Sequence, residues 1–247
     1  MTQLFLETAT DVCSVAIARD GVLLAEHTAA ESHQHSSHLT LFIERVLEEA
    51  KVIMTELDEV VLSDGPGSYT SLRVGAATAK GLCLALPALQ LRVVPTLAAL
   101  AMASGVTKNP VLATINSRKG EVFGQLFYVA STQVQSELGK QGIPPSLNPL
   151  ILGPTNIRLT EDDWHQKLIV AAGGREILVC GSGQGRVLEF APADNELISA
   201  SPAHCSATHL LAPASAPDHS RLVDIASYEP FYLNAPFVTK SKKKLLG

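Results

Sequence analysis

One glycine-rich stretch constrains the fold more than any other part of the chain. Residues 60–62 predict a buried strand and residues 74–86 a helix rich in alanine and glycine. Between them, Gly65-Pro66-Gly67 turns the chain sharply, because glycine tolerates positive φ and proline fixes its own φ. Ser68 or Thr70 can then accept hydrogen bonds from the free N–H groups of the new helix. This strand–turn–helix connection creates a place where an anion or another backbone segment can come close.

The candidate anion- or nucleotide-adjacent residues come from this connection and from the end of the first predicted strand. They are Glu7, Thr8, Gly65, Gly67, Ser68 and Thr70. The stretch is not a Walker phosphate loop, because Lys80 is followed by Gly81 and no Gly-Lys-Ser/Thr occurs. A connection of this kind is more often structural than ligand-binding. Both interpretations stay open at this point.

Composition excludes several classes of protein. The 247 residues are 46% hydrophobic and 17% charged, with a net charge of -5, so the chain lacks the basic field of a stand-alone nucleic-acid binder. Its four cysteines are far apart and form no Cys-x-x-Cys pair, which fits thiols in a reducing compartment. Met1 leads directly into a predicted strand, and no apolar run reaches membrane-spanning length. We therefore expect a cytoplasmic protein without a membrane partner.

Hydrophobic periodicity predicts two lobes, each opening with strands that form a hairpin. The predicted strands are residues 3–7, 13–18, 22–25, 60–62, 91–94, 111–115, 121–128 and 177–180, and the predicted helices are 39–50, 74–86, 97–103, 206–212 and 220–226. We expect an α/β fold with mixed sheets flanked by helices, duplicated along the chain.

The expected boundaries follow the breaks in this pattern. The first lobe covers residues 1–105 and the second lobe covers 106–227, with a loop-rich insertion at 130–175 and returning helices near 204–226. Residues 228–247 hold a C-terminal motif and a basic tail.

Six segments in order resemble TsaB (YeaZ-like) proteins. They are Leu4 to Thr10, Cys13 to Ala16, His35-Ser36 with Leu39, Gly65 to Gly75, Ile115 to Phe123 with Gly181-Ser182-Gly183, and Glu229-Pro230-Phe231-Tyr232-Leu233. The resemblance runs from residue 3 to about 233 and is weak across 130–175 and 186–220. Glu7, Asn116, Ser71 and Asn234 depart from the family's usual Asp, Asp, Gly and Arg.

The resemblance implies a two-lobed fold of the actin/Hsp70/sugar-kinase (ASKHA) superfamily. It also implies a non-catalytic subunit that activates TsaD, the paralogue that transfers the threonylcarbamoyl group to the tRNA adenosine beside the anticodon. The two metal-binding histidines of TsaD fall on Thr96 and Leu100 in this chain. Leucine has no lone pair to coordinate a metal, so we expect no metal site and no catalytic residue here.

The same resemblance implies the partners. They are a TsaD-like catalytic subunit, a TsaE-like ATPase in the complex and, indirectly, tRNA; a homodimer is the alternative in isolation. ATP is expected only in the complex, with no cofactor bound tightly by this chain alone, because Asn116 removes a charge that would help to hold hydrated Mg²⁺. The expected interface is the family-matched His35 with the small and apolar helix positions around it: Leu39, Phe42, Arg73, Gly75, Ala76 and Ala79.

Other groups of residues compete with this interpretation. His33, His35 and His38 lie close in sequence, but no Cys or Asp completes a metal site, which favours a solvated or interface cluster. Ser14 and Asp64 make no hydrolase triad with His35, because no Gly-x-Ser-x-Gly elbow occurs. The lysines at 240 and 242–244 are typical of a solvated tail, although they can also touch tRNA phosphates. The alternative function is an independent small-molecule kinase or ATPase that uses Glu7 and the Gly65–Thr70 turn.

Overall fold

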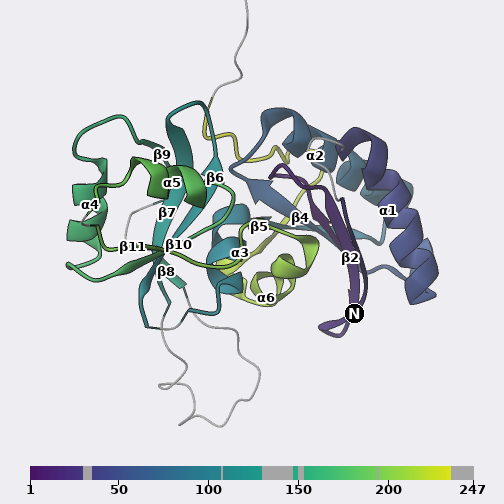
Figure 1. Ribbon diagram of the computed structural model, residues 1–247. Coiled ribbons are helices and arrows are strands. Elements are labelled where there is room, and N and C mark those ends of the chain that lie inside the picture. The colour runs from purple at the N-terminus through teal and green to yellow at the C-terminus, as the bar shows by residue number, and fades with distance from the viewer. Residues whose placement is uncertain (30–34, 107, 130–146, 150–152, 194, 235–247) are drawn as a thin grey trace, which may run out of the picture.

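The computed structural model describes all residues except 30–34, 107, 130–146, 150–152, 194 and 235–247 (Figure 1). Its first lobe is built on a six-stranded sheet in the order β12-β5-β4-β1-β2-β3. The strands are β1 (Thr2–Glu7), β2 (Ser14–Arg19), β3 (Val22–Thr28), β4 (Glu59–Gly65), β5 (Gln90–Pro95) and β12 (Arg221–Val223). Parallel pairs β1·β4 and β4·β5 combine with antiparallel pairs β1·β2, β2·β3 and β5·β12, so the sheet is mixed.

The second lobe repeats the hairpin and is also mixed. Its path is β11-β10-β6-β7-β8, and β9 pairs with β7. The strands are β6 (Pro110–Asn116), β7 (Glu121–Val129), β8 (Leu147–Pro149), β9 (Thr155–Arg158), β10 (Ile177–Cys180) and β11 (Leu197–Ser199). The expectation of two mixed sheets with hairpins near residues 4–25 and 111–128 is confirmed. The first hairpin turns at Asp20 and Gly21, both with positive φ, as its Asp-Gly sequence predicts.

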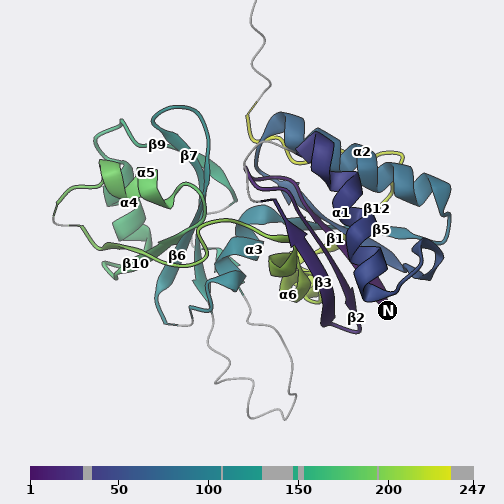
Figure 2. The ribbon, with the colours of Figure 1, turned by 45° about the vertical axis from the view of Figure 1, so that its right-hand side comes forward.

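Helices cover the sheets on both sides (Figures 1 and 2). They are α1 (His35–Ala50), α2 (Tyr69–Ala85), α3 (Thr96–Ala103), α4 (Trp164–Ala171), α5 (Gln184–Phe190) and α6 (Leu211–Ala214), with short 3₁₀ turns η1 (Met54–Glu56), η4 (Ala207–Leu210) and η5 (Pro217–His219). Figure 2 shows α1 and α2 side by side on the outer face of the first sheet, while α3 and α6 lie on its opposite face, toward the second lobe. Among the described residues, no helix has the length and apolar character that a membrane span requires.

Helix α3 lies between the two sheets and belongs to the core of both lobes. Every residue from Thr96 to Met102 is buried, which explains why its sequence is apolar on all sides. Its side chains share one hydrophobic cluster with Phe5 and Val61 of the first sheet and with Phe123 and Phe127 of the second. The lobes are therefore packed through a common core.

The chain returns to the first lobe near its C-terminus. Residues 220–226, which we expected to be helical, contain β12 instead, so that prediction was wrong. β12 pairs antiparallel with β5, and Arg221 reaches Asp64 at 3.0 Å, which together fix this segment on the first sheet. The other expected returning helix, 206–212, is found as η4 followed by α6. The backbone N–H of Ala207 in η4 donates to Ser14 Oγ of β2 at 3.0 Å, so this segment also packs on the first lobe.

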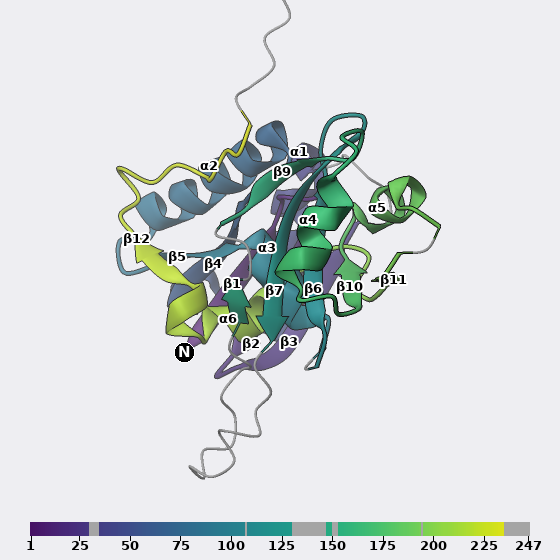
Figure 3. The ribbon, with the colours of Figure 1, turned by 90° about the vertical axis from the view of Figure 1, so that its left-hand side faces the viewer.

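The segment 130–175 is not loop alone. Its described part contains β8, β9 and the helix α4, whose Trp164 and Leu168 fill the core of the second lobe. Figure 3 shows α4 lying along the sheet beside β7 and β6. The prediction of a loop-dominated insertion was wrong for β9 and α4, which lie in the second half of the segment, beyond most of its Pro-, Ser- and Gln-rich residues. β8 forms within the first half through its pairing with β7.

Candidate functional site

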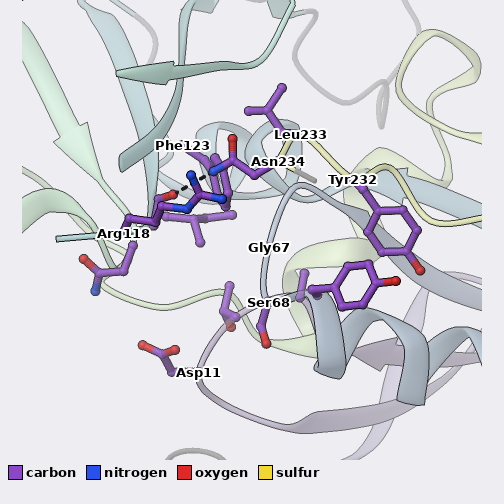
Figure 4. Close-up of a pocket in the computed structure, with 14 residues that line it drawn as sticks. Asp11, Gly67, Ser68, Arg118, Phe123, Tyr232, Leu233 and Asn234 are labelled. Atoms are coloured by element: carbon purple, nitrogen blue, oxygen red, sulfur yellow. Dashed lines mark hydrogen bonds between the residues drawn. The ribbon is translucent and has the colours of Figure 1, made fainter. Parts of the chain in front are cut away.

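A pocket of about 320 Å³ with both polar and apolar lining residues lies between the two lobes (Figure 4). Four chain segments and one side chain line it: residues 9–11 after β1, 67–69 at the start of α2, 115–118 at the end of β6, 232–234 near the C-terminus, and Phe123. The first three segments lie at a strand end or at the start of a helix, where the backbone leaves the regular layers. The fold thus brings together the glycine turn, the β6–β7 turn and the C-terminal motif that the sequence singled out.

The glycine turn packs against the protein's own backbone. A Cβ atom on Gly67 would lie 2.9 Å from the Cα atom of Ala9, and one on Gly65 would lie 2.6 Å from the carbonyl oxygen of Phe231. The backbone N–H of Ser68 donates to the carbonyl oxygen of Ala9 at 2.8 Å. Of the two roles that the sequence left open for this turn, the approach of other backbone segments accounts for both glycines.

Helix α2 begins at Tyr69, five residues before the range 74–86 that the sequence predicts, and one of the two expected capping residues precedes it. Ser68 is the N-cap residue: its Oγ accepts from the backbone N–H of Ser71 at 3.5 Å and from the Ser71 hydroxyl at 2.9 Å. Thr70 is exposed in the first turn of α2 and does not line the pocket. Gly67 and Ser68 are the only ones of the six candidate anion-adjacent residues on the described pocket wall.

Glu7 and Thr8 lie beneath the pocket wall, within the fold. One carboxylate oxygen of Glu7 accepts from the backbone N–H groups of Ala9 at 2.7 Å and Thr10 at 3.1 Å. The side chain is fully buried, and this burial raises the pKa of Glu7 to about 7 despite the hydrogen bonds that oppose it. Glu7 therefore holds the loop that lines the pocket, while Thr8 packs against Gly75 of α2.

The second lobe contributes an ordered turn to the pocket. The amide of Asn116 donates to the carbonyl oxygen of Ser182 at 2.8 Å, and the Ser182 hydroxyl accepts from the Asn116 backbone N–H at 3.1 Å. Arg186 of α5 donates to the carbonyl oxygens of Arg118 at 2.9 Å and Glu121 at 2.8 Å. Asn116 thus has a structural partner in Ser182.

The two positions at which the resemblance implies metal ligands in a relative are core positions in this chain. Thr96 is fully buried, and its Oγ1 accepts from the backbone N–H of Gly65 at 3.1 Å, which ties α3 to the glycine turn. Leu100 is also fully buried. Within the described residues, no group of three or more His, Cys, Asp or Glu side chains is arranged to hold a metal. His33 lies outside the described residues, and His38 packs against Phe42 of the same helix.

The structure places most of the expected interface residues inside the first lobe. Five of them belong to its core and are buried: Leu39, Phe42, Gly75, Ala76 and Ala79. Leu39, Phe42, Ala76 and Ala79 pack in one hydrophobic cluster with side chains of the first sheet. Their contact with a partner stays a prediction. Arg73 is exposed, and its guanidinium lies 5.4 Å from the ring centroid of Tyr69. His35 is the first residue of α1; its side chain is outside what the structure describes.

A second, more apolar cavity opens between α1 and α2 on the outer face of the first lobe. Its volume is about 460 Å³, and α1, α2 and η1 line it with Thr40, Ile43, Glu44, Leu47, Met54, Thr78, Gly81 and Leu82. We call this the α1/α2 groove. Beside it, Ala77 is exposed, and a Cβ atom on Gly81 would meet nothing within 4 Å. Ala77 and Gly81 are four residues apart and so share one helix face; both belong to the alanine- and glycine-rich helix that the sequence predicts.

Comparisons with known proteins agree with the architecture. A family model described as TsaD, tRNA N6-adenosine threonylcarbamoyltransferase, matches residues 23–145. The tRNA threonylcarbamoyladenosine biosynthesis protein TsaB of Escherichia coli (strain K12) is 33% identical over 126 residues, which are 50% of this chain and 53% of that protein. The TsaB protein of Bacillus subtilis (strain 168) is 28% identical over 145 residues, 58% of this chain and 60% of that protein.

Structural similarity extends further along the chain than these sequence matches. The structure of YeaZ from Pseudomonas aeruginosa superposes with a TM-score of 0.70 and 23% identity, covering 94% of this chain and 99% of that one. The chain spans about half the length of the curated relatives it matches. The resemblance to TsaB (YeaZ-like) proteins is thereby confirmed in sequence and in fold.

Proposed function

We propose that this chain is a non-catalytic subunit that docks a TsaD-like paralogue and activates threonylcarbamoylation of the tRNA adenosine next to the anticodon. Support for the pathway comes from the TsaB relatives, whose names place them in threonylcarbamoyladenosine biosynthesis. The TsaE-like ATPase and tRNA then join the assembled complex. We also propose that ATP is held in that complex, with no tight cofactor site in this chain alone.

Support for a non-catalytic role comes from the chemistry of the interlobe pocket. Its polar side chains are hydroxyls, amides, one carboxylate from Asp11 and one guanidinium from Arg118. Glu7, the acidic residue at the end of β1, is fully buried in the core, and burial raises its pKa. Thr96 and Leu100, the positions at which the resemblance implies metal ligands, are buried in α3.

The α1/α2 groove is the observation that carries the docking proposal. Apolar side chains floor it, small residues on α2 flank it, and it opens on the outer face of the first lobe. The TsaD family model matches residues 23–145, a range that contains both helices. A paralogue of the same fold presents a corresponding helix pair, so like faces can meet about a pseudo-two-fold axis, as in isologous dimers. Small residues on α2 allow the helix backbones to approach closely.

Co-purification with the TsaD-like paralogue from the same genome tests the proposal. Ala77→Arg is expected to abolish the complex. The new side chain occupies the space that the partner helix needs, and its charge is buried against an apolar surface. Val170→Arg is the matched control: Val170 is 70% exposed on α4 of the other lobe, so this variant is expected to bind normally. The measurement is the recovered amount of complex on size-exclusion chromatography.

The results separate docking from independent catalysis. A folded Ala77→Arg protein that binds as well as the unmodified chain contradicts docking at the α1/α2 groove. ATP turnover at an ordinary enzymatic rate by the purified chain without a partner contradicts the non-catalytic role and favours the kinase or ATPase alternative.

A further inference from the structure

The last described residues of the chain, 228–234, cross from the first lobe to the second at the pocket. We call them the C-terminal strap. In Figure 1 the strap (yellow) runs above the space between the lobes, while α3 joins them below. Tyr232, Leu233 and Asn234 form one wall of the pocket in Figure 4. The strap therefore contacts both lobes, and its Leu233 also packs against the hydrophobic cluster that the lobes share.

The first-lobe anchor is centred on Asp64 at the end of β4. The Tyr228 hydroxyl donates to Asp64 Oδ1 at 3.0 Å in a buried position, and Arg221 pairs with Oδ2 at 3.0 Å. The backbone N–H of Phe231 donates to the Asp64 carbonyl oxygen at 2.8 Å. Burial and the neighbouring Asp64 raise the pKa of Tyr228, which keeps its hydroxyl protonated as a donor. One acidic residue thus fixes both the side chain and the backbone of the strap.

The ring of Tyr232 continues this contact onto α2. Its ring centroid lies 4.8 Å from that of Tyr69. The Tyr69 ring also contacts the guanidinium of Arg73. Aromatic pairs at this separation contribute attraction beyond simple burial.

The second-lobe anchor is the β6–β7 turn. The Asn234 amide donates to the Ser117 hydroxyl at 3.3 Å, shown as a dashed line in Figure 4. Ser117 is itself held in place, because Arg186 donates to the carbonyl oxygens on both sides of the turn. The strap ends on a turn that the second lobe keeps rigid.

We propose that the C-terminal strap restrains the angle between the lobes and so sets the width of the interlobe pocket. The lobes share α3 on one side, and a packed helix is the natural axis for their relative rotation. The strap is a second link between the lobes, anchored on β4 in the first and on the β6–β7 turn in the second, and it resists that rotation. When either anchor is cut, the lobes rotate about α3 and the pocket widens. This inference does not rest on the proposed function, since all the contacts lie within this chain.

Distance measurements between spin labels test the strap directly. Labels are attached to cysteines introduced at Glu48 on α1 and Lys167 on α4, both exposed and on opposite lobes. The four native cysteines are buried, so the introduced thiols react selectively. With the strap intact, pulsed EPR is expected to give one narrow distance distribution. Asn234→Ala and Tyr228→Phe, which cut one anchor each, are expected to give broader distributions with longer means.

The control and the decisive outcome use the same measurement. Tyr128→Phe removes a tyrosine hydroxyl from the second lobe outside the strap and is expected to leave the distribution unchanged. If both anchor variants are folded, as judged by circular dichroism, and keep the narrow distribution, the proposal is wrong. Should Tyr228→Phe fail to fold, Asn234→Ala decides alone, because its side chain is part-exposed and lies at the rim of the pocket.

Discussion

Ala79→Arg is expected to unfold the first lobe, while Ala77→Arg, two residues away on the same helix, is expected to leave it folded. Ala79 is fully buried among the side chains between α2 and the first sheet. An arginine there adds volume to a packed core and buries a charge among hydrophobic side chains. The cost is about 4 kcal/mol or more, a large fraction of the stability of an ordinary domain. Ala77 is exposed, so its replacement changes stability by roughly 0.5 kcal/mol or less.

Urea unfolding followed by circular dichroism measures both variants. The two variants also separate two causes of lost partner binding. Ala77→Arg is expected to lose binding while it stays folded, whereas Ala79→Arg is expected to lose binding because its first lobe is unfolded. An Ala79→Arg protein with unaltered unfolding would mean that this face of α2 is open, contrary to the structure.

Glu7→Gln is expected to remove a pH dependence of stability that the unmodified chain carries. Burial raises the folded-state pKa of Glu7 from an ordinary value of 4.5 to about 7. Below pH 4.5 the carboxyl is protonated in both states, and its contribution to stability is fully present. As the pH rises from 4.5 to 7, only the unfolded state ionises freely, so stability falls by about 3 kcal/mol and then levels off. Glutamine stays neutral and keeps an oxygen for the N–H groups of Ala9 and Thr10.

The difference between the two proteins is the quantity to measure. Urea unfolding at pH 4.5, 5.5, 6.5, 7.5 and 8.5 gives the free energy of unfolding of each. Burial lowers the pKa of His209 and His219, which makes stability fall toward low pH, but this contribution is common to both proteins and cancels in the difference. Parallel stability curves for the unmodified chain and Glu7→Gln would show that Glu7 ionises normally.

The sequence predicted the architecture well because its strands carry strong local signals. Alternation and apolar runs mark β1, β2 and β6, the Asp-Gly pair marks the first hairpin, and Ser68 marks the start of α2. These features depend on neighbouring residues alone. The segment 220–226 lacked such a signal: it forms a strand because β5 offers it a free edge and Asp64 binds Arg221, contacts between residues far apart in sequence.

The candidate site was predicted less well, for two physical reasons. Small residues occupy α2 on every side, at Gly75, Ala76, Ala77, Ala79 and Gly81, so hydrophobic periodicity cannot tell its buried face from its exposed face. The state of Glu7 depends on its complete enclosure by η4 and the first sheet, which only the tertiary fold determines. The glycine turn and the C-terminal motif were recognised, but their direct contact through Phe231 and Gly65 was not.

The position of α3 has a consequence for how the molecule melts. The eight-residue helix α3 is buried against both sheets. If one lobe unfolds, the other lobe therefore loses part of its own core. The two lobes meet near Gly105, but they do not unfold independently of each other. Calorimetry is expected to record one cooperative transition, with equal calorimetric and van't Hoff enthalpies, and residues 1–105 expressed alone are expected to aggregate through the uncovered face of α3.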